Sequence, residues 1–95
     1  MDPIYIYLPI KKQWLQHICS GYYDYYQTCI DYYQKRFINV LNAQAQGKPV
    51  TAVFYHREIG RVYVPVKYIK TLRLDDKSMY YDLSLDISNV KREQL

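Results

Sequence analysis

Apolar and polar side chains alternate along this chain with two different periods, and the change occurs near Gly47. From Lys11 to Gln46 the apolar side chains recur about every 3.6 residues and fill roughly half of a helical wheel. From Val50 to Ile87 they recur at every second residue, which is the period of a strand. The pattern predicts one long amphipathic helix, capped at Gly47 and breakable only at Ser20-Gly21, followed by strands.

The expected strands are bounded by turn residues. Ile4 to Ile10 alternates within a proline-flanked segment, and we predict a short edge strand because proline cannot donate to a ladder. The later strands are predicted at Val50 to His56, Arg61 to Leu74 and Met79 to Ile87. The predicted fold is a single α+β domain over residues 1–95, in which the helix packs on a mostly antiparallel sheet of about four strands. A frayed polar tail is expected over residues 88–95.

Closing the two strand connections as four-residue loops predicts which side chains share a sheet face. In that register Val53 lies opposite Val64, and both point toward the helix. Lys70 then falls on the apolar face opposite Leu83. Either its ammonium reaches out at an edge or a bulge shifts the register after Pro65. The opposite face carries Phe54, His56, Arg61, Tyr63, Lys67 and Arg73.

The length of the predicted helix suggests self-association. Unbroken, it extends about 54 Å, whereas a compact chain of this size has a diameter of roughly 32 Å. We therefore expect a homodimer, in which a second copy covers part of the apolar helix face. The predicted dimer interface is Trp14, Ile18, Tyr22, Tyr25, Tyr26, Cys29, Tyr32 and Tyr33. Tyrosines left uncovered there would instead suit a protein target, with the chain acting as an inhibitor or adaptor.

Tyrosine and basic residues point to a second kind of partner. The chain has 13 tyrosines against 2 phenylalanines and 1 tryptophan, and its net charge is +4. Sheets that bind single-stranded nucleic acid stack bases on aromatic rings and neutralise phosphates with cations. We predict a nucleic-acid-binding site at Phe54, His56, Arg61, Tyr63, Lys67 and Arg73. The alternative is an ordinary solvated sheet face with cross-strand ion pairs.

Catalytic and metal chemistry have little support in the sequence. It contains no phosphate-binding glycine loop, nucleophile elbow or zinc spacing, so we expect no enzyme activity, cofactor or metal. It has no apolar run of about 18 residues and no signal-peptide pattern, so a cytoplasmic protein without membrane contact is expected. Cys19 and Cys29 are predicted to be free, buried thiols.

The predicted order of elements resembles one known family. A strand, a long helix and three antiparallel strands in a small basic chain are similar to the RelE-type ribosome-dependent RNase toxins. That resemblance implies RNA cleavage, with His56, Arg61, Arg73 and Tyr81 as the residues to test for contacts with RNA. The tyrosine-rich, motif-poor composition is also similar to that of small proteins encoded by viruses and mobile elements.

Overall fold

The computed structural model describes residues 3–31, 35–73 and 78–93. In chain order the elements are β1 (Ile4–Pro9), α1 (Lys12–Cys19), β2 (Tyr25–Asp31), α2 (Lys35–Ala45), β3 (Val50–His56), β4 (Gly60–Arg73), β5 (Ser78–Leu85), the 3-10 helix η1 (Ile87–Asn89) and β6 (Lys91–Arg92). The predicted α+β class is confirmed. Its details differ, because the described residues form a mixed six-stranded sheet with two short helices.

The single long helix was a wrong prediction, although Ser20-Gly21 is where the helix ends. Gly21 has φ of 74°, and its N–H donates to Ile18 O at 3.1 Å. The N–H of Tyr22 donates to His17 O at 3.1 Å, which completes the glycine-terminated helix end known as a Schellman motif. The chain then enters β2, whose tyrosine, threonine and isoleucine residues favour an extended backbone.

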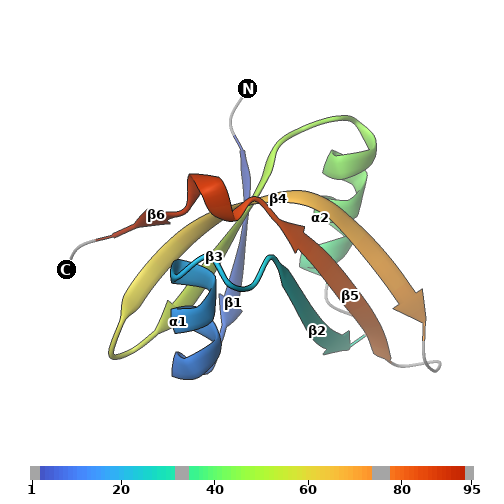
Figure 1. Cartoon of the computed structure of the whole chain (residues 1–95). Coiled ribbons are helices and arrows are strands. Elements are labelled where there is room, and N and C mark those ends of the chain that lie inside the picture. Colours follow the sequence, from blue (N-terminus) through green and yellow to red (C-terminus); the bar gives the residue numbers. More distant parts are fainter. Residues whose placement is uncertain (1–2, 32–34, 74–77, 94–95) are drawn as a thin grey trace.

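The strand order in the sheet is β1-β3-β4-β5-β2. β1 pairs with β3 in parallel and the other pairs are antiparallel. The predicted edge position of β1 is confirmed, and β2 forms the other edge. Figure 1 shows β4 as a long, bent strand that links the β1–β3 pair to the β5–β2 pair.

The predicted register between β3 and β4 was wrong by one residue. His56 pairs with Gly60, so the loop has three residues, and the N–H of Ile59 donates to His56 O at 3.1 Å. Gly60, which directly follows the loop, has φ of 95°, a backbone conformation that glycine adopts without the strain of a side chain. Because side chains alternate along a strand, this single step places Phe54 on the helix side and Tyr55 on the opposite side.

Of the two alternatives for Lys70, the structure shows the bulge after Pro65. Val66 pairs with Leu85 and Tyr68 pairs with Ser84, which leaves Lys67 as the extra residue of β4. The alternation of β4 is thereby reset, and Ile69 is buried beside the core while Lys70 lies opposite Asp82.

Both helices pack on one face of the sheet. Leu15 and Ile18 of α1 and Val40 of α2 belong to one core cluster with inward side chains from the four strands β1, β3, β4 and β5. These strand residues include Ile6, Ala52, Phe54, Val62, Val64, Ile69, Leu83 and Leu85. The other face, called here the outer face, carries Tyr5, Tyr7, Thr51, Val53, Tyr55, Arg61 and Tyr63.

The polar tail, expected to be frayed, forms ordered elements in its described part. η1 follows β5, and β6 then pairs with β4 at Val62 and Tyr63. The N–H of Glu93 also donates to Arg61 O at 3.0 Å. Neither α1 nor α2 is long and apolar enough to cross a membrane.

Candidate functional site

A groove runs along one end of the sheet, where the chain leaves β1 for α1. Its larger part is a cleft of about 720 Å³, lined by Pro9, Ile10, Lys11, Trp14, Tyr23, Tyr25, Tyr26, Gln27 and His56. A second cleft of about 470 Å³ is lined by Pro9, Ile10, Tyr55, His56, Arg57, Gly60 and Arg61. Because Pro9, Ile10 and His56 line both clefts, we treat them as the aromatic half and the basic half of one groove.

The aromatic half contains a chain of neighbouring rings from α1 and β2. The ring centroids of Trp14 and Tyr23 lie 5.1 Å apart, and those of Tyr23 and Tyr25 lie 6.3 Å apart. The helix end at Gly21 makes this possible, because it turns the chain back so that Tyr23 returns to α1. Trp14 remains 41% exposed despite these contacts. The rings thus support one another and still present aromatic surface to solvent.

Tyr26 joins the groove to the core. Its ring packs edge to face against Phe54, with centroids 4.9 Å apart, and its hydroxyl donates to Pro9 O at 3.2 Å. That hydrogen bond ties β2 to the end of β1, although the two strands lie at opposite edges of the sheet. Burial raises the pKa of the half-buried Tyr26 phenol. Tyr26 therefore stabilises the wall of the groove.

A polar network holds Tyr25 in place. Its hydrogen bond to the Asp82 carboxylate is the main reason why its pKa rises to about 12. The Gln27 side chain donates to Asp82 Oδ1 at 2.7 Å and to the Tyr25 hydroxyl at 3.3 Å. Hydrogen bonds from Tyr25 and then Gln27 lower the pKa of Asp82, and the Lys70 charge adds to this effect. Asp82 is therefore charged and Tyr25 neutral across the physiological range.

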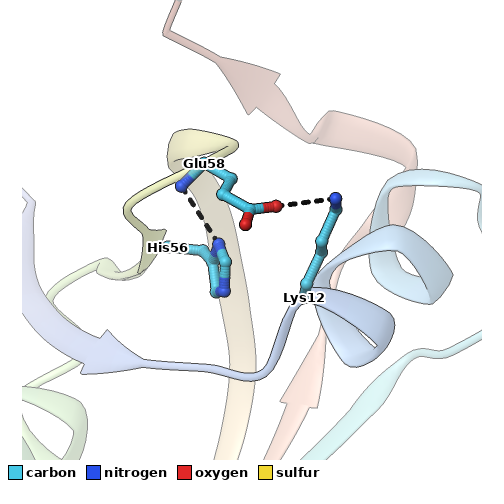
Figure 2. Close-up of polar contacts among 3 residues, drawn as sticks. All are labelled: Lys12, His56 and Glu58. Atoms are coloured by element: carbon cyan, nitrogen blue, oxygen red, sulfur yellow. Dashed lines mark hydrogen bonds and ion pairs between the residues drawn. The ribbon is translucent and has the colours of Figure 1, made fainter.

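His56 and Glu58 meet at the junction of the two halves. The N–H of Glu58 donates to His56 Nδ1 at 3.1 Å, so the ring proton of neutral His56 lies on Nε2. The Glu58 carboxylate forms an ion pair with Lys12 Nζ at 2.7 Å, as Figure 2 shows. The hydrogen bond and charge of Lys12 lower the pKa of Glu58.

The ion pair leaves the groove positively charged. Lys12 neutralises Glu58, the acidic residue that follows Arg57 of the basic half in the sequence. Within the described part of the chain no carboxylate forms an ion pair with Lys11, Arg57 or Arg61. All three side chains are exposed and line the groove. The groove thus combines these cations, Lys11 in the aromatic half and Arg57 and Arg61 in the basic half, with the exposed ring of Trp14.

The residues predicted to bind nucleic acid do not share one face. His56 and Arg61 line the groove. Tyr63 shares the outer face with Arg61 but does not line the groove, and its ring centroid lies 6.2 Å from that of Tyr5. Lys67 is the exposed extra residue of the bulge. Phe54 is completely buried, because the shorter hairpin loop turns it toward the helices. The side chain of Arg73 lies outside those described.

The predicted dimer residues do not form a helix face either. Trp14, Tyr25 and Tyr26 line the aromatic half of the groove, and the last two belong to β2. Ile18 is fully buried in the core of its own chain, and Tyr22 is 84% exposed on the loop after α1. The Cys29 side chain, Tyr32 and Tyr33 lie outside the described parts. Cys19 was predicted to be buried but is exposed.

Several groove residues were missed by sequence reasoning. Tyr23 was assigned to the helix and Tyr55 to the face under it, whereas Lys11, Gln27 and Arg57 were given no role. The signal that would have found Tyr23 is the density of aromatic and β-branched residues that follows Gly21, which favours a strand.

Comparisons with known proteins do not identify the chain: no family model, curated protein or solved structure matches it. The order of elements behind the RelE-type resemblance is not the observed order, since β2 separates two short helices. Of the residues that the resemblance implied, His56 and Arg61 share the groove, whereas Tyr81 is 4% exposed within the core. Among the described residues no three metal-ligating side chains cluster together.

Proposed function

We propose that this protein binds single-stranded nucleic acid in the groove between α1, β2 and the β3–β4 loop. The observation that carries the proposal is that aromatic rings and arginines without an ion-pair partner among the described residues line two clefts that share Pro9, Ile10 and His56. Trp14 and Tyr23 line one half of the groove, and Arg57 and Arg61 line the other half. Bases stack on aromatic rings without regard to sequence, while basic side chains follow the phosphates.

The accessibility of the bases favours a single strand as the ligand. The two clefts of the groove, about 720 and 470 Å³, lie in the size range of pockets that hold small ligands. Unstacked bases are accessible only in single strands, loops and ends. The net charge of +4 adds a general attraction to a polyanion.

The number of cations in the groove predicts how strongly binding should depend on salt. If Lys11, Arg57 and Arg61 each neutralise one phosphate, the plot of log K against log salt concentration should have a slope of about −2. Stacking on Trp14 should contribute about 1–3 kcal/mol, which corresponds to roughly 5- to 150-fold in affinity.

The experiment is a titration of a fluorescently labelled oligonucleotide, followed by anisotropy at low salt. Trp14→Leu keeps apolar bulk but removes the ring, and Arg61→Gln removes one charge. Both variants should weaken binding. Tyr22→Ala removes a tyrosine that is 84% exposed and does not line the groove, so it should bind normally.

Two results would overturn the proposal. One is the absence of binding to any single strand at low salt. The other is binding that Trp14→Leu and Arg61→Gln leave unchanged while both variants fold normally. A protein that binds the same groove in place of nucleic acid would favour the inhibitor or adaptor hypothesis.

A further inference from the structure

The outer face carries a second group of exposed tyrosines. Tyr5 and Tyr7 of β1 are 45% and 43% exposed, and Tyr55 of β3 is 42% exposed. Tyr63 of β4 lies beside them and packs edge to face on Tyr5. Both helices contribute to the core on the other side of the sheet. These four residues are called here the tyrosine platform.

The platform rests on a buried side chain. Val53 points to the outer face, yet it has no exposed surface. Its partners across the neighbouring strands are Tyr7 and Tyr63, so their rings are the groups in position to cover it. A ring that covers Val53 has one side on the protein and the other side toward solvent, which suits stacking.

The tyrosine platform is continuous with the groove. Tyr55 and Arg61 form a cross-strand pair at the end of the sheet, and both also line the basic half. From there the platform extends along β1 and β4 to a cavity of about 360 Å³, lined by Tyr5, Tyr63 and Lys91 among others. Lys91 pairs with Tyr63, so positive charge is present at both ends.

We infer that a bound single strand leaves the groove past Tyr55 and Arg61 and continues over the tyrosine platform toward Lys91. This inference rests on the proposed function and extends its binding site. Charge complementarity favours nucleic acid here, because Arg61 and Lys91 flank the rings. Glu93 places a negative charge beside the platform, which opposes the binding of phosphates. Its carboxylate accepts a hydrogen bond from the Tyr63 hydroxyl at 3.4 Å.

The test is a comparison of oligonucleotide lengths. An oligonucleotide of about 4 nucleotides should fill the groove, whereas one of about 12 should also reach the platform. We expect the longer one to bind at least about 10-fold more tightly. In the double variant Tyr5→Ile and Tyr7→Ile, which keeps residues that favour strands, this gain should disappear while the affinity for the short oligonucleotide stays the same.

Two further variants sharpen the result. Glu93→Gln should strengthen binding of the longer oligonucleotide only, because it removes the carboxylate beside the platform. Tyr22→Ala should change neither affinity. Equal affinity for both lengths, or a length gain that survives the double variant, would overturn the inference and leave the groove proposal intact. Absence of binding to either oligonucleotide by the unmodified protein at low salt would overturn both.

Discussion

The side-chain amide of Gln44 in α2 pairs with the main chain of Ile69 in β4. The N–H of Ile69 donates to Gln44 Oε1 at 2.6 Å, and Gln44 Nε2 donates to Ile69 O at 3.1 Å. β3 pairs with β4 only as far as Val66, so at Ile69 no strand among the described residues lies beside β4 on the side where β3 pairs earlier. Gln44 therefore supplies the two hydrogen bonds that another strand would otherwise provide.

Replacing Gln44 by alanine should destabilise the fold by about 2 kcal/mol, because it leaves a part-buried donor and acceptor without partners. Chemical denaturation would measure this loss, and the amide of Ile69 should exchange faster with solvent. Gln46→Ala changes the same residue type at an exposed position nearby and should have little effect. Equal stability of the two variants would contradict the role given to Gln44.

The register of the β3–β4 hairpin predicts unequal effects at two adjacent aromatic residues. Phe54 is fully buried, so Phe54→Ala should cost about 3–5 kcal/mol of stability. Tyr55 is 42% exposed on the other face, so Tyr55→Ala should cost much less. Thermal or chemical unfolding of the two variants would check this order. The reverse order would support the register expected from a four-residue loop.

The Tyr25–Asp82 hydrogen bond predicts how stability depends on pH. Asp82 has a pKa below its ordinary 3.8, so its contribution is present above that value and is lost as pH falls through the lowered pKa. Tyr25 has a pKa raised from 10.0 to about 12, so its contribution is present below pH 10 and is lost as pH rises toward 12.

Asp82→Asn should weaken both effects, because it removes the charged acceptor. Nuclear magnetic resonance of labelled tyrosine should then show the pKa of Tyr25 moving from about 12 toward 10. The stability of the variant should vary less between pH 10 and 12 than that of the unmodified protein. An unchanged pKa of Tyr25 would show that Asp82 is not the cause.

The sequence predicted most strands correctly but not the middle of the predicted helix, where β2 separates α1 from α2. Period-two alternation located Val50–His56 with its observed bounds, and the prolines identified the β1 edge. β2 was missed because its paired tyrosines also fit the apolar half of a helical wheel. The local signal against a helix is the glycine followed by aromatic and β-branched residues, which favour a strand.

The candidate site was less predictable than the fold. The sequence correctly pointed to tyrosine and arginine, but the groove forms only because β2 joins the far edge of the sheet and the Tyr26 side chain reaches the end of β1. A one-residue change in the hairpin loop also decided that Phe54 is core and that Tyr55 is surface. The formation of the groove and the burial of Phe54 both depend on how strands far apart in the sequence pair. The residues next to Phe54 and Tyr55 in the sequence do not reveal this pairing.

The most direct test of nucleic-acid binding uses the fluorescence of Trp14, which is the single tryptophan and lines the groove. Titration with an unlabelled single-stranded oligonucleotide at low salt should quench its emission to saturation, and added salt should reverse the change. Emission that stays constant while anisotropy reports binding would place the ligand elsewhere. Constant emission without any binding would contradict the proposed function itself.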